Sequence, residues 1–233
     1  MSVSMIPTSG FEELAIVIVA KNHNPTMLTL DFLQSSGIVP LDWKLAEPAV
    51  LNSHRAEVQF TNDTIISTKY DSIIFSQTIE NKPLEDIKIP AIVRKYIQTL
   101  PNVDYQGLEI NPSTFVTFED ENKGAFRHYI ATSLLSSGAW HDFGKEPVIA
   151  TLHLGYTLER GKFNLKIDDV RLLQTDNTPQ SAVLFSGNFH YEIAGNTSSE
   201  RLQYLCRLID SWQNDFKTYR ELVNQRFLDK PVQ

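Results

Sequence analysis

The sequence has little cysteine, no marked concentration of positive charge and no apolar run long enough to enter a membrane. It is 233 residues long and holds one cysteine, Cys206. A single thiol can form neither an internal disulfide nor a cysteine-rich zinc site, which favours a reducing, cytoplasmic location. The apolar run over residues 14–20 follows two glutamates and is too short for a signal core or a membrane span. We therefore expect no membrane contact.

Charge and motifs narrow the function classes further. The formal net charge is −7 and the sequence pI is about 5.4, so the chain repels phosphate backbones unless a basic stripe compensates. The nearest approach to such a stripe is Arg94-Lys95, and we expect no nucleic-acid partner. The six histidines show no recognised metal-ligand spacing, and the two Ser-Ser-Gly stretches lack the glycine that precedes a nucleophilic serine. A catalytic role is therefore less expected than a non-enzymatic one, with no cofactor and no metal.

The sequence predicts the same order of secondary-structure elements in its first and second halves. In the first half, a β-branched run over 14–21 predicts a buried strand and residues 28–34 a short helix, before three alternating stretches over 56–79 and a helix over 89–100. In the second half, extended segments over 105–118 break at Asn111-Pro112, and a helix over 126–136 follows. Strands over 148–158, 162–172 and 182–193 then lead to one long helix from about 198 to 228.

Short echoes support this repeat. Asn24-Pro25 precedes Ser35-Ser36-Gly37 in the first half, and Asn111-Pro112 precedes Ser136-Ser137-Gly138 in the second. The order predicts an α+β fold of tandem βαβββα units, residues 1–101 and 102–233, merged into one domain. We expect one large antiparallel sheet of about eight strands with helices packed on one face. The alternative is coincidental turn chemistry on an ordinary α+β domain, because loops require these residue types.

Alternation with a period of two gives the second-half strands one apolar and one polar face. His153, Asn188 and His190 fall on the polar face and are the candidate binding residues for a small molecule. The two imidazoles could serve together as ligands or as acid and base, provided that they lie within about 10 Å of each other. The alternative is a polar face that simply meets water.

The last predicted helix begins with a capping signature, Thr197 followed by Glu200. Its apolar stripe alternates spacings of three and four residues and would extend over roughly 45 Å. Such a stripe is typical of a core helix that lies on the sheet, and equally of a seam that binds a second copy or a protein partner. The candidate seam residues are Leu205, Ile209, Trp212, Phe216 and Tyr219.

Three segments carry a resemblance to known proteins: NPTMLTLDFLQSSGIVPLDWKLAEP, LFSGNFHYEI and IDSWQNDFKTYRELVNQRF. They resemble a group of uncharacterised cyanobacterial proteins over nearly the whole chain. More loosely, TIISTKYDSIIFSQ and the final helix are similar to a sporadically distributed bacterial family without an assigned function. The resemblance implies a cytoplasmic bacterial protein and supplies no catalytic residues.

Two hypotheses follow. The first is a non-enzymatic binding or interaction protein that uses the polar sheet face or the terminal helix, with a protein partner or a homodimer. The second is a small-molecule-binding protein or a minor enzyme with its site between the sheet and the helices. The sequence does not identify the ligand, the partner or the oligomeric state.

Overall fold

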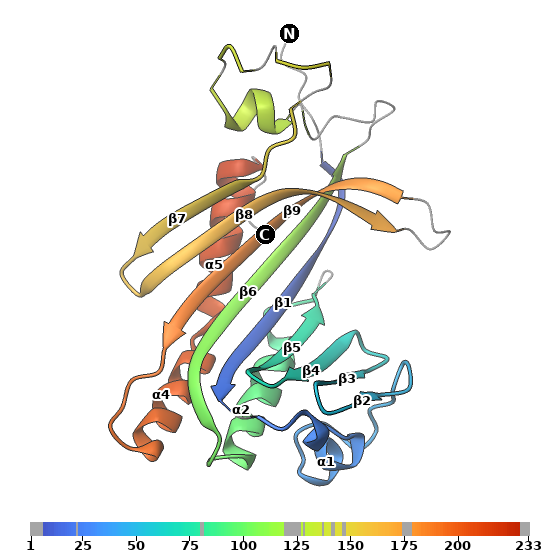
Figure 1. Ribbon diagram of the computed structural model, residues 1–233, viewed down its shortest axis with the longest axis vertical. Coiled ribbons are helices and arrows are strands. Elements are labelled where there is room, and N and C mark those ends of the chain that lie inside the picture. The colour runs from blue at the N-terminus through green and yellow to red at the C-terminus, as the bar shows by residue number, and fades with distance from the viewer. Residues whose placement is uncertain are drawn as a thin grey trace.

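A computed structural model describes residues 7–21, 23–79, 82–118, 127, 129–136, 138–140, 143–145, 148–173 and 179–228. Its main feature is one nine-stranded sheet with the strand order β2-β3-β4-β5-β1-β6-β9-β8-β7 (Figure 1). Every neighbouring pair is antiparallel. The strands are β1 (Pro7–Lys21), β2 (Val50–Leu51), β3 (Arg55–Gln59), β4 (Thr64–Lys69), β5 (Ser72–Thr78), β6 (Asp104–Phe118), β7 (Leu152–Leu158), β8 (Gly161–Leu173) and β9 (Pro179–Glu192).

Helices α2, α4 and α5 lie together behind this sheet in Figure 1. The helical elements are η1 (Pro25–Met27), α1 (Leu30–Ser35), η2 (Leu84–Asp86), α2 (Ile89–Thr99), η3 (Ile130–Leu134), α4 (Ser198–Asp210), α5 (Trp212–Arg220) and η4 (Glu221–Phe227). The predicted α+β class and large antiparallel sheet are confirmed. The sheet has nine strands instead of about eight, because the two-residue β2 adds to one edge.

The two longest strands lie at the centre of the sheet. β1 and β6 have 15 residues each and pair with one another over nearly their whole length. On its other side β1 pairs with β5, the last strand of the first meander, and β6 pairs with β9, the last strand of the second. The chain therefore leaves the centre, forms a meander and returns to the centre twice.

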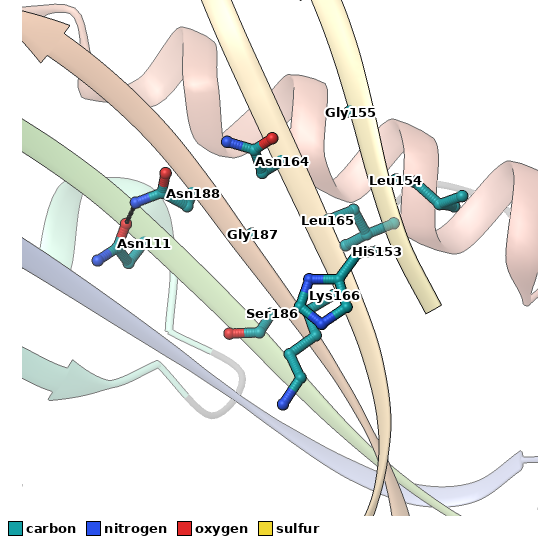
Figure 2. A pocket seen from close by; sticks show the side chains of 10 residues that line it. All are labelled: Asn111, His153, Leu154, Gly155, Asn164, Leu165, Lys166, Ser186, Gly187 and Asn188. Carbon is teal, nitrogen blue, oxygen red and sulfur yellow. Dashed lines mark hydrogen bonds between the residues drawn. The ribbon is translucent and has the colours of Figure 1, made fainter. Parts of the chain in front are cut away.

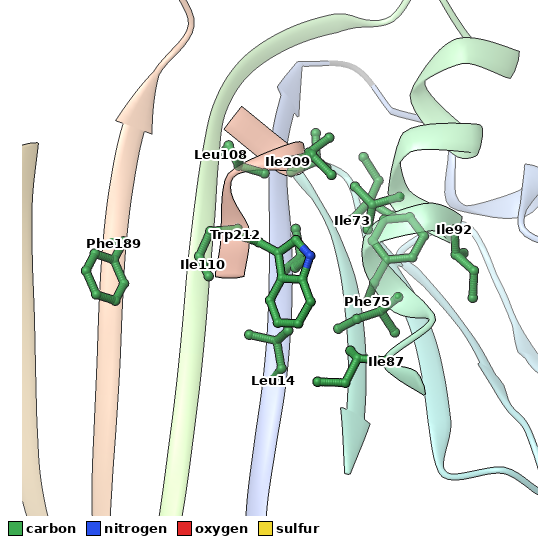
Figure 3. Packing of buried hydrophobic residues seen from close by; sticks show 14 of the residues in the cluster. Leu14, Ile73, Phe75, Ile87, Ile92, Leu108, Ile110, Phe189, Ile209 and Trp212 are labelled. Carbon is green, nitrogen blue, oxygen red and sulfur yellow. The ribbon is translucent and has the colours of Figure 1, made fainter. Parts of the chain in front are cut away.

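Alternation along the central strands decides which side chains form the core. Leu14, Ile16 and Ile18 of β1 are all fully buried, and so is Ile110 of β6. Trp212 at the start of α5 lies over these strands and faces the first meander (Figure 3). Each fully buried aliphatic side chain contributes about 1.5–3 kcal/mol, so this layer supplies much of the driving force for folding.

The predicted break at Asn111-Pro112 is wrong, because β6 runs through it without a change of register. Proline has no N–H, and the recorded pairing with β9 skips residues 111 and 112 between Ile110↔Phe189 and Ser113↔Ser186. The ladder to β9 therefore lacks a donor at Pro112. Asn24-Pro25, its proposed echo, instead opens η1 after β1, so the two dipeptides do not occupy matching places.

The second proposed echo pairs Ser35-Ser36-Gly37 with Ser136-Ser137-Gly138, and the structure describes only part of it. In the first half Gly37 follows the end of α1 with a left-handed φ of 66°, the conformation of a helix stop. In the second half Ser137 lies outside the described residues.

The terminal helix begins with the predicted capping box at Thr197 but is not continuous. It is divided at Ser211, whose φ and ψ of −90° and 2° separate α4 from α5, and a π-helical turn, η4, ends it. The alternative of a partner seam is wrong for this stripe, because one copy of the chain already buries it against the sheet. Its members and their exposed fractions are Leu205 0%, Ile209 0%, Trp212 6%, Phe216 0% and Tyr219 0%.

Polar contacts fix α5 to the strands beneath it. Arg220 forms an ion pair with Glu12 of β1, and its guanidinium lies 4.4 Å from the ring centre of Phe216. The fully buried Asp215 accepts hydrogen bonds from Arg160 Nη1 at 2.6 Å and from the Tyr191 hydroxyl at 2.8 Å. Burial raises the pKa of this carboxyl, while its two donors oppose that shift.

Tyr219 sits in the tightest contact of this interface. Its hydroxyl lies 2.9 Å from Thr114 Oγ1 and donates to the Phe185 carbonyl at 2.8 Å. Its ring packs directly on Gly187 of β9, where an added Cβ would lie 2.8 Å from Tyr219 Cδ2 and 3.1 Å from Phe163 Cε2. Gly187 therefore provides a close approach between helix and strand.

Several buried polar side chains lie in the first half, His23 and Thr68 among them. His23 is 3% exposed, its Nε2 lies 2.6 Å from the Tyr96 hydroxyl, and burial lowers its pKa. Thr68 of β4 is fully buried, and its hydroxyl finds no hydrogen-bond partner among the described residues. None of the helices formed by the described residues is long and apolar enough to span a membrane.

Candidate functional site

The sheet has a second face, opposite α2, α4 and α5, which we call the open face. On β7 the side chains of this face are exposed, while those of the helix-covered face are half-buried. On β9 the helix-covered face is largely buried, whereas the open face is half-buried or exposed from Leu184 to Glu192 and buried only at Ala182. Among the described residues, the same alternation that builds the core thus leaves much of the second face of the sheet partly or fully exposed.

Ten residues form what we call the polar patch on the open face, where the second half of the chain lies. They come from four adjacent strands and stand in register across them. The members are Glu109, Asn111 and Ser113 of β6, Ser186, Asn188 and His190 of β9, Lys162, Asn164 and Lys166 of β8, and His153 of β7.

A depression of about 430 Å³ lies within this patch (Figure 2). Its sides are formed by His153, Lys166 and Ser186 at one end and by asparagines at the other. The predicted residues His153 and Asn188 therefore line one hollow. That hollow lies on the open face, whereas the predicted small-molecule site lay between sheet and helices, where the hydrophobic core is packed.

Three asparagines form a row across the depression. Asn188 Nδ2 donates to Asn111 Oδ1 at 2.9 Å, and Asn164 stands opposite Asn188 on the next strand. Gly155 of β7 continues the row without a side chain, and a Cβ added there would lie 3.6 Å from Asn164 Oδ1. Neutral amides that both donate and accept suit a ligand or partner rich in hydroxyl or peptide groups.

Lys166 is already neutralised on the rim of the depression. Its ammonium donates to Asp168 Oδ2 at 2.6 Å, and the Thr151 hydroxyl donates to Asp168 Oδ1 at 2.8 Å. The hydrogen bond from Lys166, assisted by the one from Thr151, lowers the pKa of Asp168. The patch therefore offers hydrogen bonds more than a net charge.

The register separates the two histidines that were predicted to act together. His153 stands opposite Lys166 and then Ser186, whereas His190 lies four residues further along β9. Two strand spacings and four residues amount to roughly 16 Å, beyond the reach of joint proton transfer. His190 instead faces Glu109, with Nδ1 3.3 Å from Oε1. The hypothesis of a cooperating histidine pair is therefore wrong.

Apolar side chains form part of the open face in the first half of the chain, where they lie among polar side chains such as Ser67, Ser72 and Ser76. We call the apolar side chains the apolar patch; this group is half-buried and consists of Ala15, Val17 and Val19 of β1, Ile65 of β4 and Ile74 of β5. It borders the polar patch directly, since Val17 pairs with Glu109 and Ala15 with Asn111. Further along the central strands, Phe11 and Phe115 stack with ring centres 4.3 Å apart.

Two further features of the described residues bear on possible chemistry. Among them, no group of three or more histidine, cysteine, aspartate or glutamate side chains is placed to hold a metal ion. A second hollow of about 390 Å³ between α2 and α4 is lined by Arg94, Cys206 and Asp210. There Arg94 is paired with Asp210, and burial raises the pKa of the Cys206 thiol, which keeps it protonated and weakly nucleophilic.

Asn111 is not among the predicted site residues, because the sequence alone predicts a break between extended segments at Asn111-Pro112. The signal was present in the alternation of Glu109, Asn111 and Ser113, which continues the polar face across Pro112. No protein-family model matches this sequence, and no curated protein matches it either.

Proposed function

We propose that this protein is a non-enzymatic binding protein that holds a protein partner on the open face of its sheet. The observation that carries the proposal is the composition of that face, where the apolar patch lies directly beside the polar patch. Protein interfaces combine an apolar centre with a surrounding polar rim that supplies hydrogen bonds. The terminal helix is not available for this role, because its apolar stripe is buried.

Several features favour a macromolecule over a substrate. The open face extends over the whole sheet, whereas the depression is lined by only four of its strands and its one lysine is paired within the chain. The single cysteine supports a cytoplasmic location, and the acidic balance disfavours a nucleic acid as the partner. The resemblance to uncharacterised cyanobacterial proteins stays a prediction.

We also infer that the chain arose from two βαβββα units, residues 1–101 and 102–233. The strand order supports this better than the sequence echoes do. Each proposed unit starts with a central strand that pairs with the last strand of its own meander, and the two central strands pair with one another. On this view the apolar and polar patches are equivalent surfaces that diverged in composition.

The binding proposal is tested by a matched pair of surface substitutions. Asn164→Arg places a bulky charge in the polar patch, and Asn214→Arg makes the same change at an exposed position of α5. Each tagged protein is used to capture partners from a bacterial lysate, and the captured proteins are quantified by mass spectrometry. We expect a partner that wild type and Asn214→Arg retain and that Asn164→Arg loses. Equal retention by both variants would contradict the proposal.

A small polar ligand in the depression is the second candidate, favoured by the row formed by Asn111, Asn188 and Asn164. Its test is titration with a neutral polyol such as glucose while the side-chain amide resonances of these three residues are followed by NMR. Saturable shifts confined to the row would support this candidate. Unchanged resonances would remove it while leaving the partner proposal intact.

A further inference from the structure

The two edges of the sheet are built differently. At one edge, β2 is only two residues long and follows Pro48 closely. At the other, β7 has seven residues, none of them proline or formally charged, and pairs with β8 without a bulge. Proteins usually protect a free edge with short strands, prolines, charges or bulges. The β2 edge has such protection, and the β7 edge has none of these four devices.

The geometry of the hairpin decides which backbone groups of β7 are free. β7 and β8 are joined by the two-residue turn Glu159-Arg160, so Leu158 bonds to β8 and hydrogen-bonded positions then alternate. The even-numbered residues therefore bond to β8. His153, Gly155 and Thr157 direct their N–H and C=O groups away from the sheet, and within the described ranges no backbone partner is recorded for them.

We propose that β7 pairs with the β7 of a second copy of this chain, antiparallel and about a two-fold axis at Gly155. Gly155 is the middle residue of the strand, so this register overlaps all seven residues. His153 of each copy then stands opposite Thr157 of the other, and the outward groups form about six hydrogen bonds. On the other face, Leu154 stands opposite Tyr156, which joins two apolar rows.

Charge favours a second copy as the occupant. The paired residues carry no formal charge, and just beyond them Glu159 of each copy would stand opposite Thr151 of the other. No like charges therefore meet in this register, and identical surfaces are joined by a two-fold axis, as in most homodimers. Ile149, which is 65% exposed three residues before β7, adds apolar surface at each end of the contact.

The dimer would change the depression on the open face. His153 and Gly155 line the depression on its β7 side, and Gly155 lies on the proposed axis. The second copy would place its own β7 along that side and join the two polar patches into one continuous surface. The proposal does not depend on the identity of any ligand or partner.

The test uses two double variants at the same positions. His153 and Thr157 stand opposite Lys166 and Lys162 within one chain, so H153E/T157E adds favourable contacts inside the monomer. Across the two-fold axis, however, the introduced carboxylates face one another at both ends. The control variant H153E/T157K places opposite charges across the axis instead. Circular dichroism and thermal melting establish that both variants are folded.

Sedimentation velocity measures the dimer dissociation constant of each protein. We expect wild type to dimerise, H153E/T157E to bind itself at least about 100-fold more weakly, and H153E/T157K to remain within about 10-fold of wild type. A wild-type protein that stays monomeric at roughly 100 μM would overturn the proposal. A dimer that both double variants leave unchanged would overturn it too, because the contact would then lie elsewhere.

Discussion

Replacing Gly187 by alanine tests the packing of α5 on the sheet, because we expect it to destabilise the protein, whereas glycine-to-alanine changes in strands usually stabilise. In the interior of a strand, alanine is normally more stable than glycine by about 0.5–1 kcal/mol. At this position the new Cβ would lie 2.8 Å from Tyr219 Cδ2 and 3.1 Å from Phe163 Cε2. Both rings are buried, so neither can move away into solvent.

The magnitude follows from two contributions. Overpacking of a buried site costs about 1–3 kcal/mol. Displacing the Tyr219 ring also strains its hydrogen bonds to Thr114 and to the Phe185 carbonyl, which adds about 1 kcal/mol. After the intrinsic preference for alanine is subtracted, we expect Gly187→Ala to lower the free energy of unfolding by about 1–3.5 kcal/mol.

The assay is urea unfolding at low protein concentration, followed by circular dichroism. Gly155→Ala is the matched control, because its Cβ would lie 3.6 Å from the nearest atom, Asn164 Oδ1, in ordinary contact. That control should raise stability by about 0.5 kcal/mol. In a Tyr219→Ala background, Gly187→Ala should lose most of its cost, since only the contact with Phe163 remains. If its cost is the same in both backgrounds, the close-approach explanation is wrong.

Three further predictions concern polar groups elsewhere in the chain. Burial lowers the pKa of His23 below 6.5, so the unfolded chain takes up a proton that the folded chain resists, and the free energy of unfolding should fall as the pH drops below about 6.5. Urea unfolding of His23→Gln at pH values between about 7 and 5 should show a smaller loss of stability than wild type. Thr68→Val should raise the free energy of unfolding by about 1 kcal/mol, because it removes a buried hydroxyl that has no hydrogen-bond partner among the described residues. Thr114→Val should lower the free energy of unfolding by a similar amount, because it removes the hydrogen bond with the Tyr219 hydroxyl. Thermal melts that rank the two variants in the reverse order would refute this prediction. Arg220→Met should cost about 1–2 kcal/mol in urea unfolding, since it leaves Glu12 unpaired at 19% exposure, and Glu12→Gln should recover part of that cost in the double variant.

Much of the fold could be predicted because side-chain periodicity is local. The meander strands appear close to the predicted positions, and the capping box at Thr197 begins α4 as expected. The break at Ser211 could not be predicted in the same way, because the apolar spacing continues through it. Pro112 was misleading because its effect depends on which neighbour its missing N–H would have faced. That neighbour is fixed only when the sheet assembles.

The candidate site was harder to predict than the fold. Alternation placed His153, Asn188 and His190 on one face, but register across three strands determines which of them are close together. A shift along β9 of four residues separates His190 from His153, and no local pattern specifies that shift. The asparagine row likewise depends on pairing between segments that are far apart in the chain.

In a sheet with its core helices on one side, one set of alternate residues supports the fold, and under the proposed function the other set supports recognition. On β9, Gly187 and Phe189 are constrained by α5 and the core, while Asn188 between them points away from both. The outward-facing residues can therefore be substituted one at a time with little effect on the hydrophobic interior. This arrangement allows the scaffold to acquire a new binding specificity without having to evolve a new fold.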